Sequence, residues 1–225
     1  MKTSKQQILP IDQRKLRLAL QPRPRDSHKG NFGHALIVGG DIGMAGAALM
    51  AAEACARTGA GKISVATRAE HTTAFIARTP ELMARGVEAR DQLLPLLSVA
   101  SVVVIGPGLG QSDWSKEMLE VVLATNLPLV VDADALNLIA ASNEKPKREN
   151  WILTPHPGEA ARLLQTDTKL IARDRPQHAM ALQQCFQGVV VLKGMGSLIA
   201  TPEALYQCKR GNPGMASGGM GDVLS

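Results

Sequence analysis

Short apolar runs alternate with longer segments of helical pattern along most of the chain. Runs of four to six mostly apolar residues are typical of buried strands, and the segments between them are long enough for helices. Continuous apolar strands that alternate with helices indicate a parallel sheet covered by helices on both faces. The sequence therefore predicts an α/β fold with a mainly parallel sheet, whose strands are expected at 34–38, 62–67, 101–105, 127–131, 151–153 and 189–192.

Two helical segments are visible near the start of the chain. Residues 45–59 are small and apolar on most faces, as expected for a buried helix. Residues 12–20 carry Leu16 and Leu20 at i and i+4, which predicts a short helix that packs on the domain. The proline-rich residues 21–24 then end this helix.

Each strand-like run is followed directly by residues that suit ligand binding. In open α/β sheets, ligands bind beyond the carboxyl ends of the strands. We therefore expect five motifs to converge on one crevice: Gly39-Gly40, GPGLG at 106–110, DAD at 132–134, TPHPGE at 154–159 and KGMGS at 193–197.

The glycine-rich stretch 211–222 precedes a short segment that reads as the first turn of a helix. A glycine-rich turn at a helix N-terminus presents unpaired amides and a partial positive charge, which favours bound anions. An Asp just beyond such a turn, here Asp222, can accept the proton of a hydroxyl that attacks a phosphoryl group. The structural alternative is that Asp222 only complements the helix dipole.

Composition and charge narrow the function classes. The chain of 225 residues suits one domain, and its net charge of +5 comes from the first 30 residues, where eight Lys and Arg face two Asp. The rest is nearly neutral and only 3% of all residues are aromatic, so we expect no nucleic-acid partner. The absence of a signal peptide or long apolar run, and three cysteines without a C-x-x-C pair, predict a cytoplasmic protein that binds no membrane.

Four motifs together resemble a known family. SHKGNFG at 27–33, TPHPGE, KGMGS and GNPGMASGGMGD at 211–222 occur in the order found in ADP-dependent NAD(P)H-hydrate dehydratases, which have the ribokinase-like fold. The resemblance implies that ADP phosphorylates the hydroxyl of the hydrated nicotinamide ring, after which phosphate leaves and NAD(P)H is restored. It also implies Mg²⁺, a homotetramer, and a separate or fused NAD(P)H-hydrate epimerase as a partner.

The resemblance also implies roles for individual residues. Asp222 would be the catalytic base and, with Ala45, Gly108 and His156, would contact the hydrated nucleotide. Two glycine-containing segments would bind ADP: Lys193, Gly194, Met195, Gly196 and Ser197, and then Gly218, Gly219 and Gly221. The amides of residues 218–221 would stabilise charge on the transferring phosphoryl group.

Several residues keep a structural alternative. Related sugar kinases have Asn-x-x-Glu where this chain has His156 and Glu159, so Glu159 is expected to reach Mg²⁺ through water or to complement a helix dipole. Asp132 and Asp134 could bind Mg²⁺ or cap a helix, and capping is favoured for at least one of them. Lys193 is expected beside a nucleotide phosphate rather than extending from a strand end into solvent.

The expected organisation is a basic leader with a short helix over residues 1–26 and a ribokinase-like domain over 27–225, without the C-terminal helices through which the family continues. Residues 211–225 are expected to be mobile, because a helix of one turn is marginal. Two other functions stay open: a kinase for a small alcohol or vitamin precursor, and a nucleotide-binding protein without catalysis.

Overall fold

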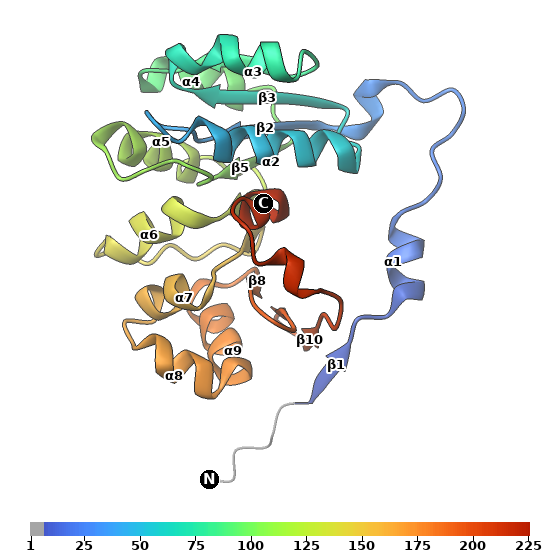
Figure 1. The fold of residues 1–225 in the computed structure, drawn as a ribbon, viewed down its shortest axis with the longest axis vertical. Helices are drawn as coiled ribbons and strands as arrows, with labels where there is room; N and C mark the ends of the chain where they lie inside the picture. Colours follow the sequence, from blue (N-terminus) through green and yellow to red (C-terminus); the bar gives the residue numbers. More distant parts are fainter. Residues whose placement is uncertain (1–6) are drawn as a thin grey trace.

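The computed structural model describes residues 7–225, and its centre is a single mixed sheet (Figure 1). Across the sheet the strands follow the order β1-β10-β9-β8-β7-β6-β5-β2-β3-β4, and every pair from β8 to β4 is parallel. β9 is antiparallel to β8 and β10. The strands are β1 (Ile8–Pro10), β2 (His34–Val38), β3 (Lys62–Thr67), β4 (Met83–Gly86), β5 (Val102–Ile105), β6 (Leu129–Val131), β7 (Trp151–Leu153), β8 (Val189–Leu192), β9 (Leu198–Ala200) and β10 (Leu205–Gln207).

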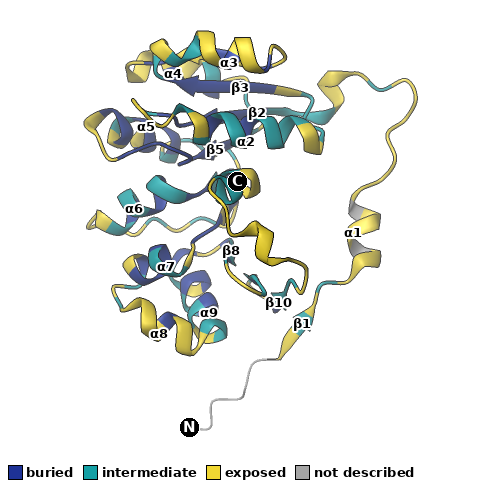
Figure 2. Cartoon of the chain, viewed as in Figure 1, coloured by how far each residue is buried: buried dark blue, intermediate teal, exposed yellow. Residues whose placement is uncertain are grey.

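Helices cover both faces of the sheet, and each face has its own apolar core (Figure 2). The larger core lies between the sheet and helices α4 to α9, and the smaller one lies under α2 and α3. The helices are α1 (Gln13–Ala19), α2 (Ala45–Thr58), α3 (Thr72–Arg78), α4 (Arg90–Leu97), α5 (Asp113–Leu123), α6 (Ala133–Ala141), α7 (Pro157–Leu163), α8 (Thr168–Arg173), α9 (Arg175–Phe186) and α10 (Met220–Leu224). Short 3-10 turns lie at Lys29–Phe32, Ala69–His71 and Pro213–Met215.

The predicted α/β architecture and its six strands are confirmed, with starts that differ by up to two residues. Four strands were not anticipated: β1, β4, β9 and β10. Three of these have only three residues, and all four lie on or near the edges of the sheet. β1 and β4 are edge strands with a partner on one side only, and β9 and β10 are too short for an apolar run to stand out, so the pattern gave no signal for them.

The chain reverses its direction of travel across the sheet between β2 and β5. From β2 it adds β3 and β4 on one side, and then returns to place β5, β6, β7 and β8 in succession on the other. Such a reversal separates the loops that leave two neighbouring strands, and the space between them is where α/β sheets bind ligands. The loops after β2 and β5 flank this point.

The N-terminal arm differs from the prediction. A helix forms at α1, with Asp12 as its N-cap, but Leu16 and Leu20 are 50% and 80% exposed, so the expected packing on the domain is wrong. The arm is held at its two ends instead: β1 pairs with β10, and the Arg23 guanidinium lies over the Phe32 ring. The stretch between these anchors carries α1 away from the body of the domain (Figure 1).

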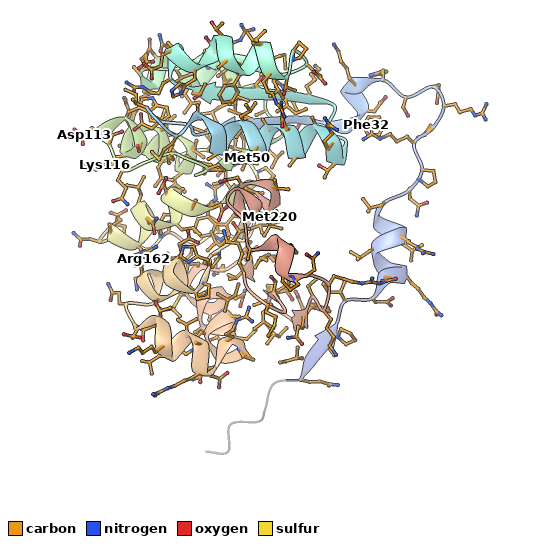
Figure 3. All side chains as sticks on the ribbon, in the orientation of Figure 1. Phe32, Met50, Asp113, Lys116, Arg162 and Met220 are labelled. Carbon is orange, nitrogen blue, oxygen red and sulfur yellow. The ribbon has the colours of Figure 1, made fainter. Side chains whose placement is uncertain are left out.

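The C-terminal helix α10 packs on α2. Gly219 precedes this helix with φ +87°, a conformation that favours glycine, and it lies against the end of the Met50 side chain. Figure 3 labels Met50 on α2 and Met220 on α10 where the two helices meet. Across the part of the chain that the structure describes, no helix is long and apolar enough to cross a membrane.

Hydrogen exchange should distinguish the sheet from the C-terminal stretch. Residues 211–218 are exposed and α10 has only five residues, so the amides of both segments should exchange fast. The amides of β2 and β5 should exchange slowly, because these strands lie inside the sheet with a partner strand on each side. Exchange followed by mass spectrometry would measure both. Slow exchange at residues 218–222 without ligand would show that the packing on α2 alone is enough to order the turn.

Candidate active site

The five expected motifs lie side by side. They follow β2, β5, β6, β7 and β8, which are consecutive neighbours in the sheet and run parallel. Their loops therefore leave the same edge of the sheet, and the predicted convergence is confirmed.

Gly108 lies against the start of α2, which begins at Ala45, where the chain reverses between β2 and β5. Ala45 is the first residue of α2, and a Cβ on Gly108 would lie 2.4 Å from the carbonyl oxygen of Met44. Gly108 also has φ +57°, so both its conformation and its surroundings require glycine. The Asp41 amide donates to the Gly108 carbonyl at 2.7 Å, which joins the two loops into one wall.

Hydrogen bonds from side chains strengthen this wall. The Ser112 hydroxyl donates to Asp41 at 2.7 Å, and the Gly110 amide donates to Asp134 at 2.9 Å. Asp134 therefore holds the loop after β5. The sequence offered no signal for Ser112, because a serine after a glycine-rich loop is ordinary.

Asp132 and Lys193 form the most buried ion pair of the site. Lys193 Nζ lies 2.6 Å from Asp132 Oδ1, and the two side chains are 17% and 1% exposed. The Ser225 hydroxyl donates to the other oxygen of Asp132 at 2.5 Å. Lys193 is therefore turned into the site, and the alternative of a lysine extending into solvent is excluded.

Neither Asp132 nor Asp134 caps α6, so the preference for capping was wrong. Asp132 occupies the N-cap position, yet its side chain makes no capping hydrogen bond. Its two oxygens are taken by Lys193 and Ser225, and Asp134 bonds to Gly110 instead. The nearby cation outcompetes the amides of the first helical turn, because charge-assisted hydrogen bonds are the stronger ones.

His156 and Glu159 form a capping box at the start of α7. His156 Nδ1 accepts from the amides of Gly158 and Glu159, and the His156 amide donates to Glu159 at 2.7 Å. The His156 ring is half-exposed, whereas Glu159 is 4% exposed and lies 3.9 Å from Lys193 Nζ. Burial raises the pKa of Glu159 above its usual value. Partial burial of the ring lowers the pKa of His156, and the nearby Lys193 and Arg162 lower it further.

Asp222 lies in the electrostatic field of the same cluster. Burial raises the pKa of its carboxyl, and the negative charges of Asp132 and Asp134 raise it further, while Lys193 opposes them. A Cβ on Gly221 would lie 3.5 Å from Lys193 Nζ, so the glycine-rich turn borders the ammonium directly. The site thus gathers one cation, several carboxylates and the first amides of α10.

Residues 193–197 form the turn between β8 and β9. Gly194 and Gly196 have φ values of +138° and +66°, and the Met195 side chain is 96% exposed. This turn begins at Lys193 and so lies next to the ion pair with Asp132. The structure therefore brings both predicted nucleotide-binding segments to the same ammonium group.

The described residues form no preformed metal-binding site. Over residues 7–225, no group of three or more His, Cys, Asp or Glu is arranged to hold an ion. Glu159 has one oxygen on the His156 amide and the other near the His156 ring. Mg²⁺ is commonly held by one or two carboxylates together with substrate phosphates, and a donor set of this kind suits that arrangement.

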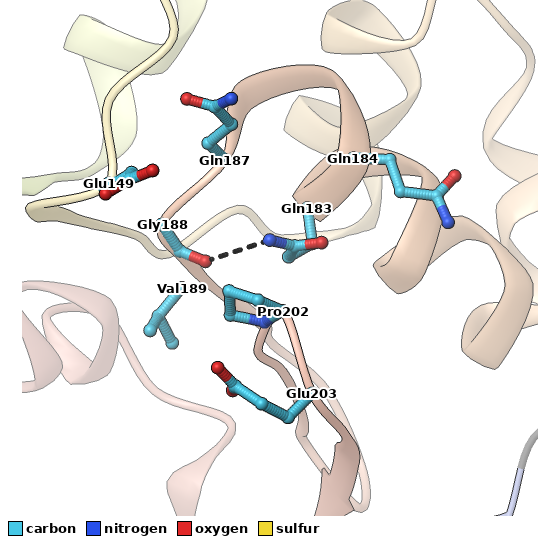
Figure 4. A pocket seen from close by; sticks show the side chains of 8 residues that line it. All are labelled: Glu149, Gln183, Gln184, Gln187, Gly188, Val189, Pro202 and Glu203. Atoms are coloured by element: carbon cyan, nitrogen blue, oxygen red, sulfur yellow. Dashed lines mark hydrogen bonds between the residues drawn. The ribbon is translucent and has the colours of Figure 1, made fainter.

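A separate hollow lies at the opposite edge of the sheet (Figure 4). It has a volume of about 490 Å³ and is lined by Glu149, Gln183, Gln184, Gln187, Gly188, Val189, Pro202 and Glu203. These residues lie near the amino ends of β7 and β8, so the hollow contains none of the predicted site residues.

The family model described as NAD(P)H-hydrate dehydratase matches residues 35–225. The chain belongs to this family. It is 58% identical over 207 residues to a bifunctional NAD(P)H-hydrate repair enzyme of Coxiella burnetii, covering 92% of the chain and 42% of that protein. It is 38% identical to an ADP-dependent (S)-NAD(P)H-hydrate dehydratase of Lactiplantibacillus plantarum, covering 90% of the chain and 73% of that enzyme.

Solved structures agree with this assignment of the dehydratase family. A crystal structure of the ADP/ATP-dependent NAD(P)H-hydrate dehydratase of Bacillus subtilis, co-crystallised with ATP and Mg²⁺, superposes with a TM-score of 0.84 and 32% identity. The match covers 96% of this chain and 78% of that one. The chain spans about two fifths of the length of the bifunctional relatives, as the 42% for the Coxiella enzyme indicates.

Replacing His156 by Asn should make stability less dependent on pH. The pKa of His156 is lowered in the folded protein, so between that value and the usual 6.5 the unfolded chain binds a proton that the folded one does not. The contribution to stability is therefore complete above pH 6.5 and is lost as the pH falls toward the folded-state value. Asn keeps an acceptor at the helix N-cap and does not titrate.

Thermal unfolding of both proteins between pH 7.5 and 5.5 would measure this difference. We expect the wild-type Tm to fall by up to about 2 °C more than that of the variant, a small effect because the ring is half-exposed and screened by solvent. Parallel profiles would show that His156 takes up its proton equally in both states.

Proposed function

We propose that this protein dehydrates (S)-NADH-hydrate or (S)-NADPH-hydrate at the expense of ADP, and so repairs damaged nicotinamide nucleotides. The observation that carries the proposal is the cluster of Lys193, Asp222 and the glycine-rich turn at the carboxyl edge of the sheet. One cation and a set of free amides suit a phosphoryl group, and a carboxylate beside them suits a hydroxyl proton. Membership of the dehydratase family supports the same reaction.

The reaction begins with transfer of a phosphoryl group. The hydroxyl oxygen of the hydrated ring forms a bond to the β-phosphorus of ADP while Asp222 takes the hydroxyl proton, and the bond to the leaving AMP breaks. The lone pair of the ring nitrogen then expels the phosphate, and loss of a ring proton restores the dihydropyridine. Every atom of ADP is recovered in AMP and phosphate, with the phosphate keeping the hydroxyl oxygen of the substrate.

The raised pKa of Asp222 suits this role. A base must be ionised to act, yet a carboxylate with a pKa nearer to neutral holds a proton better than an ordinary one. Burial and the charge of Asp132 supply this increase, and Lys193 limits it. Turnover should accordingly fall as the pH drops through the raised pKa, because the protonated carboxyl accepts no proton.

The two glycine-containing segments would bind ADP. Residues 193–197 and the amides of 218–221 border the Lys193 ammonium, which would divide its charge between Asp132 and the phosphates. Ala45, Gly108 and His156 would contact the hydrated nicotinamide nucleotide across the reversal point of the sheet. Backbone amides bind phosphate without adding a group that could react.

Mg²⁺ would enter with the nucleotide. It supplies charge neutralisation to the diphosphate, and Glu159 would reach it through a water molecule. Glu159 accepts a hydrogen bond from the His156 amide, which holds the carboxylate at the start of α7. A homotetrameric assembly, a cytoplasmic location and a partner epimerase complete the proposal and stay predictions.

Product analysis tests the proposal against its alternatives. The protein is incubated with NADH-hydrate and ADP, and with ATP in a parallel reaction, while absorbance of the restored dihydropyridine, AMP and free phosphate are followed. Restored NADH with equal amounts of AMP and phosphate supports the dehydratase. A stable phosphorylated product would indicate a kinase, and ADP binding without turnover would indicate a protein that only binds nucleotides.

Replacing Asp222 by Asn should cut turnover and leave ADP binding nearly intact. Asn has a similar shape but takes up no proton, and loss of a general base costs about 10²–10⁴ in rate. Stopped-flow turnover and calorimetric titration with ADP would measure the two effects separately. If the variant keeps most of the wild-type kcat, Asp222 is not the base.

A further inference from the structure

The Arg175 side chain lies against the turn between β8 and β9. Arg175 is the first residue of α9, and its guanidinium donates to the carbonyls of Met195 at 2.6 Å, Leu192 at 3.2 Å and Lys193 at 3.3 Å. Arginine presents five donors in a rigid planar fork, so one side chain fixes three carbonyls in a defined arrangement. A single residue outside the turn thereby contacts the main chain at three positions between residues 192 and 195.

The turn has few other contacts that could hold it. Its central side chain, Met195, is 96% exposed and contributes no apolar packing. Two of its residues are glycines with positive φ, and glycine has the largest conformational freedom to lose. Within the turn, the Ser197 hydroxyl donates to the Gly194 carbonyl at 3.1 Å, and at its start the Lys193 amide donates to Pro155 at 2.9 Å.

The direction of the carbonyls determines the direction of two amides. In a planar trans peptide the N–H points opposite to the C=O. Because the carbonyls of Lys193 and Met195 point to Arg175, the amides of Gly194 and Gly196 point away from it. Within residues 7–225 neither of these amides has a hydrogen-bond acceptor. Two unpaired amides in a glycine-rich turn are the elements of an anion-binding concavity.

The position of the Arg175 side chain leaves one of its hydrogen-bond donors without a partner among the described residues. Its Nε is buried and finds no partner in the part of the chain that the structure describes. A buried donor without a partner is unfavourable, and such groups call for an explanation. The same side-chain position that gives the three carbonyls their donors leaves Nε without an acceptor. The three contacts with the turn are therefore kept at the expense of one unpaired donor.

We propose that Arg175 is a positioning residue for the nucleotide. It turns the amides of Gly194 and Gly196 outward to receive a phosphate group of ADP, and it fixes the backbone from which Lys193 extends. Arg175 itself does not touch the nucleotide. This inference rests on the proposed function in one respect, which is that ADP binds at residues 193–197.

Arg175→Lys and Arg175→Ala test the role. Lysine keeps the charge but cannot donate to three carbonyls in a plane, and alanine has no donor at all. Both variants should therefore raise the Kd for ADP roughly 10–100-fold, the usual effect of removing a residue that orients ligand-binding groups. The Kd for the hydrated nicotinamide nucleotide should stay within about twofold, because its contacts lie on other loops and distant sites behave independently. Calorimetric titrations would give both constants.

Arg148 provides a matched control. Its guanidinium donates to the carbonyls of Leu123 at 3.2 Å and Leu127 at 3.1 Å, near the amino ends of the strands and far from the turn. Arg148→Lys and Arg148→Ala should lower the Tm but leave the Kd for ADP at the wild-type value. ADP affinity lost equally in both series, or unchanged in the Arg175 variants, would overturn the inference.

Inorganic pyrophosphate separates this inference from the proposed reaction. In ¹H–¹⁵N spectra, the wild-type amides of Gly194 and Gly196 should shift on titration with pyrophosphate, and the shifts should be lost in Arg175→Lys. Shifts of this kind in a protein without dehydratase activity would support the role of Arg175 and refute only the reaction. Wild-type amides that respond to neither pyrophosphate nor ADP would refute the role of Arg175.

Discussion

A carboxylate with almost no contact with water must be neutralised by the protein itself, and the site is organised around one such group. Asp132, at the end of β6, is 1% exposed and takes its compensating charge from Lys193 at the end of β8. Its second oxygen is bound by Ser225, beyond α10. Removing one member of a buried pair leaves the other uncompensated, so three separate parts of the chain are held together. In the proposed reaction the same ammonium group would also bind a phosphate, so the ligand would share Lys193 with Asp132.

The wall formed by the loops after β2, β5 and β6 also depends on close contacts between main chains. A Cβ on Gly106 would lie 1.8 Å from the Asp132 carbonyl oxygen, and Gly108 touches the carbonyl of Met44. Loops that leave adjacent parallel strands can approach this closely only where one of them has no side chain. A substitution at Gly106 would displace Asp132 and its ion pair, and one at Gly108 would displace the loop after β2, although neither glycine carries any charge.

The sequence predicted the features that follow from a repeating pattern of apolar residues. It did not predict contacts that depend on how distant parts of the chain lie in space. Continuous apolar runs located six strands of the sheet, and the motifs that follow them located the crevice, because parallel strands must end at one edge. The same reasoning misplaced α1 on the domain, since a pair of leucines at i and i+4 does not say whether the flanking anchors let the helix reach the core. It also missed Arg175, because an arginine at a helix start gives no sign of the three carbonyls above it.

The capping box of α7 has a chemical consequence for His156. Nδ1 accepts two main-chain amides, so the hydrogen bonds assign the neutral ring its proton at Nε2. Nε2 lies 3.2 Å from Glu159 Oε1, so its N–H faces that carboxylate, and the ring has no free lone pair with which to remove a proton while the helix stays capped. In the proposed reaction such a ring would contact the substrate without removing a proton from it. The capping box would thus leave Asp222 as the proton acceptor of the proposed reaction.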